Sequence, residues 1–391
     1  MLYILCSGDV DENMNINGIL FSEIIKRFPE SIILNIKIWK KSSLDFKVKK
    51  ITLSNGICAQ IINVYSLRYL FNLLNNKVVA LSLLSHGVKD WSVFILLRIT
   101  NTPLIYINNL STLVVIDNKY TRGDGRLIKD VIKTHLLRTL PSIMYVIFTR
   151  IGLFQKLDTV YVSNKLDYFQ FKRKKQYRRV VLVNSKSYDY FLEDDKKIYH
   201  ETYITFIDSM LPYHLDQVRL GFVAIDRKKY YDSLNVLFFQ LEDIFNLNVV
   251  ICAHPNYKME NSEIDFGKRI VVKGQTDNYI KKSRFVLFHE SSAVNTAIIY
   301  NKNVVQILSS SFNTFVKENC EVWKKIFCFN SIDLSDYSID KFNHLFNDRG
   351  DKESELRKKF IEDNIIPSYE EGVSGHSQII KDMYIHYKQR L

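Results

Sequence analysis

Short apolar runs alternate with amphipathic stretches along the first half of the chain. Apolar residues recur at helical spacing in residues 16–28 and 90–99. Buried strands that alternate with such helices are typical of a largely parallel sheet with helices on both faces. The first half is therefore expected to form an α/β domain, with strands at residues 2–6, 31–39, 58–64, 77–84, 103–108 and 112–117.

The alternation stops at a polar and aromatic stretch, "KSYDYFLEDDKKIYH" at residues 186–200, and then starts again. An amphipathic pattern at residues 227–245 predicts a long helix, and the chain after Phe312 has mostly helical periodicity. Residues 374–390 suit one closing helix. The second half is expected to contain strands at residues 202–208, 247–253, 269–273, 284–289 and 303–308.

This pattern predicts an α/β protein made of two similar halves joined by a short hinge. The layout is similar to the GT-B architecture, in which two Rossmann-like, doubly wound domains face a cleft, here with helices at the C-terminal end. We expect the N-terminal domain at residues 1–190, the C-terminal domain at residues 200–375 and a closing helix at residues 376–391. Periodicity alone equally allows other two-domain doubly wound proteins.

Length and composition support two well-packed domains. At 391 residues the chain exceeds the size of one ordinary core. Its five cysteines lack metal-ligand spacing and indicate buried thiols in a reducing compartment. The start of the sequence has no basic leader, and the longest apolar stretch is interrupted by Arg150 and is too short to span a bilayer. We therefore expect a cytoplasmic protein.

The net charge of +12 indicates an anionic partner, which can be nucleic acid, an anionic lipid or a sugar nucleotide. Cations gather in "FKRKKQYRR" at residues 171–179 and in residues 126–156. A solvated loop explains the first run equally well. No zinc-finger spacing, RNA-binding aromatic signature or helix-turn-helix pattern accompanies the charge, so we expect no nucleic-acid partner.

Polar side chains follow two of the predicted buried strands in the second half. His254-Pro255 ends the run "VVICA", and His289-Glu290-Ser291-Ser292 ends the run "RFVLF". Ligands of parallel sheets bind beyond the carboxyl ends of the strands, and we expect these two strands to be near neighbours. Ser291 and Ser292 stand where a helix begins, which suits a phosphate, and His254 can donate to that phosphate or protonate it. The alternatives are a helix cap, a turn histidine and a proline that directs the chain away from the strand.

Two further loops follow predicted strands. In "ITFIDSMLPYHLD", Asp208, Ser209 and His214 come after a strand, so we expect this loop to line the donor phosphate or the hinge. An Asp-Ser turn before a proline is the competing interpretation. In "VVKGQTDNYIKKS", Gly274 and Thr276 repeat the strand-loop-helix theme, and Gly274 is a candidate backbone contact for a nucleotide base.

The "AHP" and "HESS" units together resemble the His-Pro and Ser-Ser motifs of bacterial sialyltransferases, including lipooligosaccharide sialyltransferases and polysialyltransferases. They also resemble uncharacterised glycosyltransferases of capsule and O-antigen synthesis. The resemblance covers roughly residues 200–310. It implies a GT-B enzyme that transfers a nonulosonic acid from a CMP-sugar to a glycan hydroxyl without a metal. By the match, His254 contacts the donor phosphate and assists departure of CMP, and Ser291 and Ser292 bind the same phosphate.

The resemblance further implies an acceptor-binding N-terminal domain with a catalytic carboxylate in a short acidic motif that ends in glycine. The sequence departs from that motif, because Asp117 ends the run "TLVVID" and is followed by "NKYTRGDG". Asp117 is our first candidate for the base, Asp124 the second and Asp9, after the first strand, the third. A loop-capping aspartate explains Asp117 about as well, and a helix N-cap explains Asp124 better.

These features lead to further expectations about partners and cofactors. The polar groups at the predicted strand ends of the second half include histidines and hydroxyls but no Asp-x-Asp pair, so we expect no metal and no cofactor. A lipid-linked glycan acceptor would bring the protein to an anionic membrane, which the cations of residues 126–156 suit, although an amphipathic helix packed on the sheet is an alternative. Other functions consistent with the sequence are transfer from a UDP-sugar or a CDP-polyol, sugar-nucleotide epimerisation and non-catalytic polyanion binding. The cations in question are Arg126, Lys129, Lys133, Arg138 and Arg150.

Overall fold

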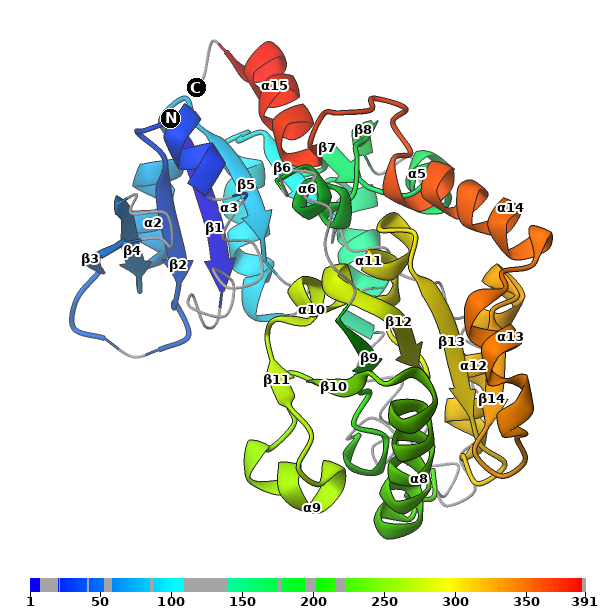
Figure 1. Cartoon of the computed structure of the whole chain (residues 1–391). Helices are drawn as coiled ribbons and strands as arrows, with labels where there is room; N and C mark the ends of the chain where they lie inside the picture. Colours follow the sequence, from blue (N-terminus) through cyan, green and yellow to red (C-terminus); the bar gives the residue numbers. More distant parts are fainter. Residues whose placement is uncertain are drawn as a thin grey trace. The chain divides into compact units, whose positions relative to one another are not determined.

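The protein forms two compact α/β units in a computed structural model (Figure 1). Unit 1 consists of the described parts of Met1–Leu110, Ile132–Asp189 and Asp363–Leu391, and unit 2 of the described parts of Tyr190–Glu362. The structure describes residues 1–7, 20, 22–40, 42–52, 58–84, 88–108, 140–141, 143–173, 177–193, 202–214 and 222–388.

Unit 1 is built on an eight-stranded sheet in the order β3-β4-β2-β1-β5-β6-β7-β8. All neighbours pair in parallel except β3 and β4, which are antiparallel. This confirms the predicted parallel sheet, although the segment at 112–117 lies outside the described residues. The strands are β1 (Leu2–Ser7), β2 (Ile32–Ile36), β3 (Phe46–Thr52), β4 (Cys58–Val64), β5 (Val79–Leu83), β6 (Leu104–Ile107), β7 (Leu157–Val162) and β8 (Tyr177–Leu182).

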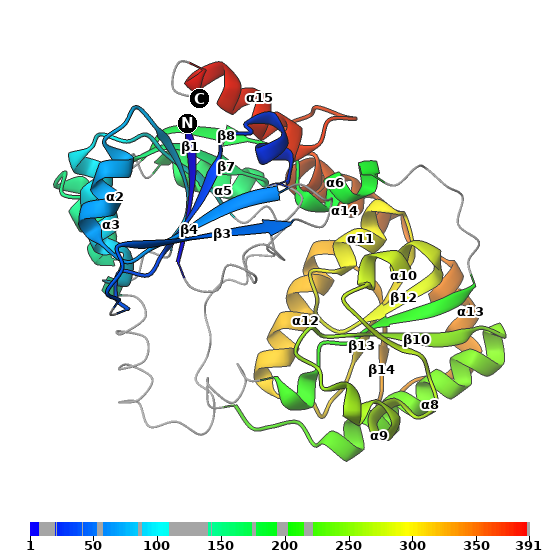
Figure 2. The same ribbon diagram turned by 90° about the vertical axis from the view of Figure 1, so that its left-hand side faces the viewer.

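Helices cover both faces of this sheet, because buried residues of alternate strand positions point to opposite sides. One apolar core joins the sheet to α2, α3, α5 and the helix at residues 143–150, and the other joins it to α15 and the helix at residues 22–27 (Figure 2). The helical elements are α2 (Leu67–Leu74), the 3₁₀ turn η1 (Val88–Asp90), α3 (Trp91–Ile99), α5 (Lys165–Arg173), α6 (Lys186–Glu193) and α15 (Gly375–Tyr387).

Unit 2 is built on a six-stranded sheet in the order β11-β10-β9-β12-β13-β14, in which every neighbouring pair is parallel. The five strands predicted for this half are all present, and β14 was not predicted. The strands are β9 (Tyr203–Ile207), β10 (Asn248–Ala253), β11 (Val271–Lys273), β12 (Ser283–Phe288), β13 (Asn303–Leu308) and β14 (Asn330–Asp333).

The long helix of unit 2 begins and ends where its sequence dictates. The Asp226 side chain accepts a hydrogen bond from the Lys229 N–H, and Asn246 ends the helix in the left-handed conformation. The helical elements of unit 2 are η2 (Leu211–Tyr213), α8 (Arg227–Phe245), η3 (Met259–Asn261), α9 (Ser262–Phe266), α10 (Thr276–Lys282), α11 (Val294–Ile299), α12 (Thr314–Phe327), η4 (Ile339–Lys341), α13 (Phe342–Asn347) and α14 (Asp351–Phe360), followed by a π-helical turn, η5 (Ile361–Ile365).

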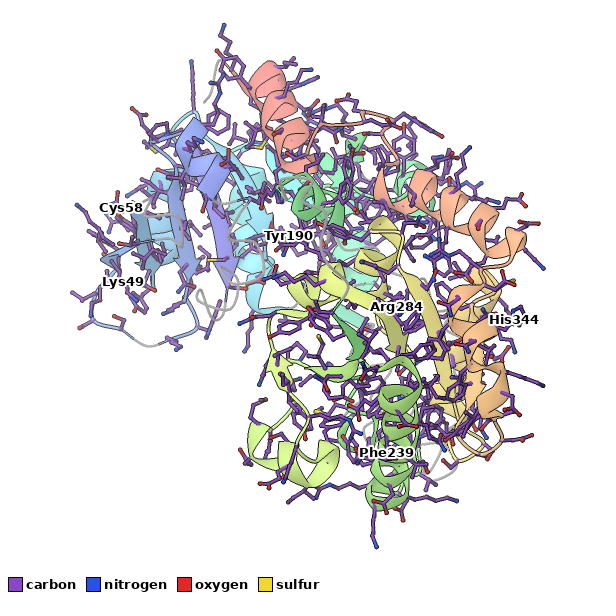
Figure 3. All side chains as sticks on the ribbon, viewed as in Figure 1. Lys49, Cys58, Tyr190, Phe239, Arg284 and His344 are labelled. Carbon is purple, nitrogen blue, oxygen red and sulfur yellow. The ribbon has the colours of Figure 1, made fainter. Side chains whose placement is uncertain are left out.

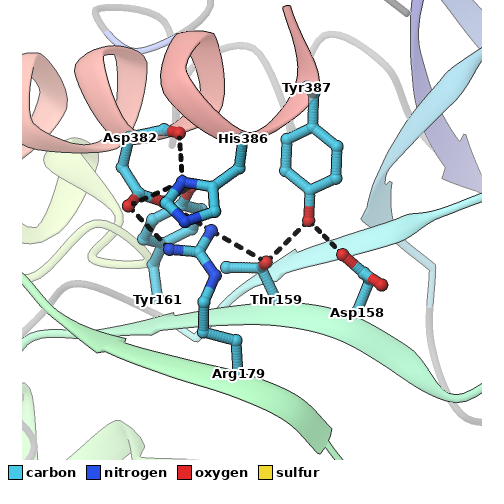
Figure 4. A network of polar contacts seen from close by, with 7 residues as sticks. All are labelled: Asp158, Thr159, Tyr161, Arg179, Asp382, His386 and Tyr387. Carbon is cyan, nitrogen blue, oxygen red and sulfur yellow. Dashed lines mark hydrogen bonds and ion pairs between the residues drawn. The ribbon is translucent and has the colours of Figure 1, made fainter. Parts of the chain in front are cut away.

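The C-terminal segment differs from the sequence-based domain assignment. We assigned residues 200–375 to the second domain, but from Asp363 onward the chain belongs to unit 1. The reason is a polar network that fixes α15 on β7 and β8 (Figure 4). Arg179 makes two hydrogen bonds of 2.6 Å to Asp382, and Tyr161 donates to the same carboxylate at 2.6 Å. Burial alone would raise the pKa of Asp382, but these bonds outweigh burial and lower it.

A hydrogen bond and close backbone packing also fix the start of α15. The Gly375 N–H donates to Asp189 at 2.5 Å, and the Cβ of any larger residue here would lie 2.1 Å from the Asn184 carbonyl oxygen. We expect Gly375→Ala to lower the free energy of unfolding of unit 1 by about 2–3 kcal/mol, because a backbone atom cannot rotate away. Calorimetry should show a loss of roughly 5–10 °C in Tm. Gly350→Ala is the control, since its Cβ meets nothing within 4 Å. An unchanged Tm in Gly375→Ala would contradict this packing.

Two other expectations concern the surface. All five cysteines are free thiols, and Cys58 on β4 is exposed, contrary to the expectation of burial (Figure 3). The reason is that β4 pairs with the exposed edge strand β3, which leaves alternate side chains in solvent. Within the described part of the chain, no helix has both the length and the apolar character needed to cross a membrane.

Candidate functional site

The topology of unit 2 places a switch point between the carboxyl ends of β9 and β12. From β9 the chain continues to β10 on one side, whereas from β12 it continues to β13 on the other side. The connections therefore diverge between β9 and β12, and open α/β sheets bind ligands at such a point. Asp208 and Ser209 follow β9, and His289 to Ser292 follow β12. The strand before His254, β10, flanks β9 on the other side, so the predicted strand ends do lie side by side.

Hydrogen bonds join the three loops at this edge of the sheet. The Asp208 N–H donates to the Cys252 carbonyl at 3.0 Å. The carboxylate of Asp208 accepts from the backbone N–H groups of Met210, at 2.9 Å, and His254. The Ser209 hydroxyl donates to the Glu290 carbonyl at 2.6 Å. Hydrogen bonds thus connect the loops after β9, β10 and β12 to one another.

His254 presents one ring nitrogen of its half-exposed side chain. Its Nδ1 accepts a hydrogen bond from the Asn256 N–H at 3.1 Å, so the neutral ring carries its proton on Nε2. Burial lowers the pKa of His254, and the nearby His214 and Lys273 lower it further. The ring centroids of His214 and His254 are 6.1 Å apart. At neutral pH, His254 is therefore an uncharged N–H donor whose pKa an incoming anion would raise.

A buried carboxylate fixes the loop that carries His254. Asp265 accepts hydrogen bonds from the Tyr257 hydroxyl at 2.8 Å, from the Tyr213 hydroxyl at 3.3 Å and from Arg227 Nε at 2.9 Å. These donors come from the loop after β10, the turn η2 and the first turn of α8. A charged, fully bonded anchor restricts the loop, and this favours a fixed position for the imidazole.

The side chain of His289 belongs to the core. It is fully buried, its Nδ1 faces the Ile307 carbonyl at 2.7 Å and its Nε2 faces the Tyr230 hydroxyl at 2.7 Å. Nδ1 must donate to a carbonyl, so Tyr230 donates to Nε2 and the ring is neutral. Burial lowers the pKa of His289 to about 4. Both nitrogens are engaged, so we leave His289 out of the proposed ligand contacts.

The other residues of the "HESS" unit are more exposed than His289, and Ser292 is the most exposed of them. Burial raises the pKa of Glu290 to about 8, although a hydrogen bond from Asn319 opposes the shift. Ser291 is partly exposed, and its hydroxyl accepts from the Ala293 N–H at 3.3 Å. Ser292 is exposed. The helix that follows, α11, has six residues and begins only at Val294, so the hydroxyls are better candidate ligands than its short dipole.

Asp208 has a buried carboxyl group, and its contribution to the free energy of unfolding depends on pH. Burial raises its pKa to about 7 from an ordinary 3.8. Since the folded state holds this proton more tightly, the free energy of unfolding should fall as pH rises from about 4 to about 7. Asp208→Asn stays neutral, so we expect it to raise stability at pH 8 by about 2 kcal/mol and to change little at pH 4. Thermal melts across this range test the prediction, with exposed Asp232→Asn as control. An unaltered pH dependence in Asp208→Asn would contradict it.

Gly274 and Pro255 lie at the same edge of the sheet. Gly274 follows β11, is exposed and has a φ of +74°, a conformation that disfavours larger residues. Pro255 is exposed in the turn after His254. Lys273, which the sequence analysis passed over, ends β11 with its Nζ 3.1 Å from the Tyr257 carbonyl. Three serines after β13 were also missed; the hydroxyls of Ser309 and Ser311 are 2.7 Å apart.

Asp117, Asp124 and Asp9 all lie outside the described residues, as do the cations of residues 126–138, whereas Arg150 is described and exposed. Among the described residues, no three or more His, Cys, Asp or Glu side chains are grouped so that they could hold a metal ion.

Two cavities lie away from these strand ends. One of about 590 Å³ is in unit 2, between the end of α8 and the start of β10, and its lining includes Glu242 and Arg269. The other, also about 590 Å³, is in unit 1, beside α15 and the helix at residues 22–27. The first is at the amino edge of the unit 2 sheet, opposite the edge that the topology favours.

Comparisons identify the fold. No protein-family model matches the chain, and no curated protein sequence matches it. The calicheamicin glycosyltransferase CalG4 has a TM-score of 0.51 at 9% identity, covering 99% of this chain and 98% of that chain. Apo UGT2 of Phytolacca americana has a TM-score of 0.51 at 10% identity, covering 99% of both chains. A protein assigned as UDP-N-acetylglucosamine 2-epimerase from Listeria monocytogenes has a TM-score of 0.50 at 10% identity, covering 99% and 97%.

These neighbours are of the GT-B type, so the chain has the GT-B fold, with parallel sheets in two units and helices at the C-terminal end. This confirms the predicted fold class. At such low identity the similarity concerns the fold alone. The sialyltransferase resemblance, carried by the "AHP" and "HESS" units, stays a prediction.

Proposed function

We propose that the protein is a glycosyltransferase that binds a nucleotide-sugar donor at the strand ends of unit 2. The observation that carries the proposal is the meeting of Asp208-Ser209, His254 and Ser291-Ser292 at the carboxyl ends of three adjacent parallel strands, tied by hydrogen bonds. A neutral imidazole N–H and free hydroxyls are donors suited to phosphate oxygens. The loop anchored at Asp265 would hold His254 ready for that role.

In the proposed reaction, an acceptor hydroxyl attacks the anomeric carbon from the face opposite the nucleotide. The bond between that carbon and the phosphate oxygen breaks, and the nucleotide leaves with the bonding electron pair. A carboxylate, with Asp117 as our first candidate, takes the acceptor proton, and the configuration inverts. His254 and the serines would stabilise the charge that develops on the departing phosphate. The proposal includes no metal ion.

We further propose a CMP-activated nonulosonic acid as the donor and a surface glycan as the acceptor. A CMP leaving group is a phosphate monoester, whose charge a single imidazole N–H and a few hydroxyls can stabilise by hydrogen bonds. A UDP-sugar is the closest alternative, because one structural neighbour is assigned to a UDP-sugar reaction. A diphosphate would need more cationic contacts, and Lys273, which pairs with Ala253 in the sheet and lowers the pKa of His254, is a candidate for one of them.

A sugar-nucleotide epimerase is the second candidate function. The sequence offered few acidic groups for it, but the structure adds a specific observation. Asp208 is buried and Glu290 is partly buried, and both have raised pKa values at the ends of adjacent strands, as proton transfer at a sugar carbon would require. Epimerisation proceeds without an acceptor, whereas glycosyl transfer requires one.

One experiment tests these proposals in order. The intact protein is melted with CMP, CDP, UDP and GDP, and the sugar donor of the most stabilising nucleotide is then incubated with and without a glycan acceptor. We expect CMP to raise Tm most and the donor to be consumed faster with acceptor. Conversion of a UDP-sugar to its epimer without acceptor would favour the epimerase. Stabilisation by none of the four nucleotides would contradict both enzymes and favour a non-catalytic polyanion-binding protein.

A further inference from the structure

The helix at residues 143–150 in unit 1 has two apolar faces. One face packs on α3, where the ring centroids of Tyr145 and Phe94 are 4.9 Å apart and those of Phe148 and Trp91 are 5.3 Å apart. An amphipathic helix packed on a sheet, the simpler of our two expectations for this region, would present polar side chains on its other face. The face that packs on α3 fits the expectation of an amphipathic helix, but the opposite face does not.

The opposite face exposes branched aliphatic side chains. Ile143, Ile147 and Ile151 are 52%, 43% and 69% exposed and recur at a spacing of four residues, which places them on one side of the helix and the turn that follows it. Leu140 is exposed at the start of the same line. We call these four residues the apolar stripe. Single exposed leucines are ordinary, but a contiguous aliphatic row marks a contact surface.

Cations flank the apolar stripe, and the sequence supplies no anion to balance them. Arg150 and Lys156 are exposed, and residues 140–156 contain no Asp or Glu. The exposed Arg98, at the end of α3, donates from its Nε to the Gly152 carbonyl at 3.1 Å, which brings a third cation to the turn after the helix. Ile99, the next residue, adds another exposed aliphatic side chain.

We propose that the apolar stripe and its flanking cations dock unit 1 on the surface of an anionic lipid bilayer. Aliphatic side chains of this kind enter the boundary between head groups and acyl chains, and the cations contact the anionic head groups. A surface that pairs with an ordinary soluble protein would carry mixed charges around its apolar centre, whereas residues 140–156 contribute cations only. The proposal concerns a surface of unit 1 and does not depend on the reaction proposed for unit 2.

Vesicle flotation with the intact protein tests the proposal. The vesicles contain phosphatidylcholine with either no anionic lipid or about 30 mol % phosphatidylglycerol. We expect the protein to bind the anionic vesicles and to be released by about 1 M salt only in part, because the apolar contact is not screened. The double variant Ile143→Glu/Ile147→Glu should lower the partition coefficient at least about tenfold. Arg150→Glu should weaken binding to the anionic vesicles alone.

The matched control is Val236→Glu, which places the same charge at an exposed aliphatic position on α8 in unit 2 and should leave vesicle binding unchanged. Tm and nucleotide affinity of every variant show that it is folded. Three results would overturn the proposal: no binding of the wild-type protein to anionic vesicles, equal binding of the double variant, or a wild-type dimer that the double variant converts to a monomer. The last result would assign the apolar stripe to an interface between copies.

Discussion

Replacing His254 with alanine is expected to lower kcat by about 100-fold to 10,000-fold, the range in which positioned acid–base groups contribute. The fold should survive, because Asp208 accepts from the backbone N–H of residue 254, which alanine retains. The variant loses an acceptor for the Asn256 N–H, but that group is exposed and water can replace the ring. Steady-state transfer with saturating donor measures the effect.

The matched control for His254→Ala is the same substitution at a histidine outside the proposed site. His344 (Figure 3) is an exposed residue of α13 in the same unit and pairs with Asp348 at 3.1 Å, and His344→Ala should retain the wild-type rate. His254→Gln keeps a hydrogen-bond donor and cannot give up a proton. If it restores most of the rate, His254 acts by donation; if it is as slow as His254→Ala, proton transfer is required. A wild-type rate in His254→Ala would remove this residue from the site.

The second large effect is expected from Asp117→Asn. Loss of the base should lower kcat by about 100-fold or more, while the dissociation constant of the donor nucleotide changes less than about twofold, because Asp117 is not among the proposed donor contacts. Asparagine is close in size and removes only the proton acceptor. Calorimetric titration and turnover, measured on the same preparation, give the two numbers.

Asp124→Asn and Asp9→Asn are the matched comparisons, since each removes one carboxylate from a competing candidate. We expect both to keep at least about half of the wild-type rate. Full activity in Asp117→Asn together with a slow Asp124→Asn or Asp9→Asn would transfer the role to that residue. A proportional fall in donor affinity and kcat in Asp117→Asn would indicate a folding or binding defect in place of a lost base.

The fold was predictable where burial repeats with a regular period. Residues 303–308 and 227–245 have the predicted bounds, because a fully buried parallel strand and an amphipathic helix both leave a clear pattern. In unit 1 the edge strands β3 and β8 were missed, and so was the buried strand β7 beside β8. β3 alternates lysines with apolar residues and is almost wholly exposed, and β8 starts within the cationic run at 171–179, whose charges suggested a loop. Edge strands lack the apolar signal that central strands carry.

The location of the candidate site could be predicted from the residues that follow the strands. The burial and the contacts of its side chains could not. Sequence order was enough to bring His254, Asp208 and Ser291 to one edge of one sheet. It could not show that His289 is enclosed by Tyr230 and Ile307, because those contacts come from α8 and β13. The raised pKa values of Asp208 and Glu290 likewise follow from burial, which no local motif reports. Lys273 was missed since one lysine after a strand is common.

The account rests on one anion site at the carboxyl ends of β9, β10 and β12. The most direct test is an experimental structure of the protein with its best-binding nucleotide. We predict a phosphate oxygen within hydrogen-bond distance of His254 Nε2, with Ser291 or Ser292 on the same phosphate. A nucleotide seated in the cavity beside Glu242 and Arg269, at the opposite edge of the sheet, would contradict the account.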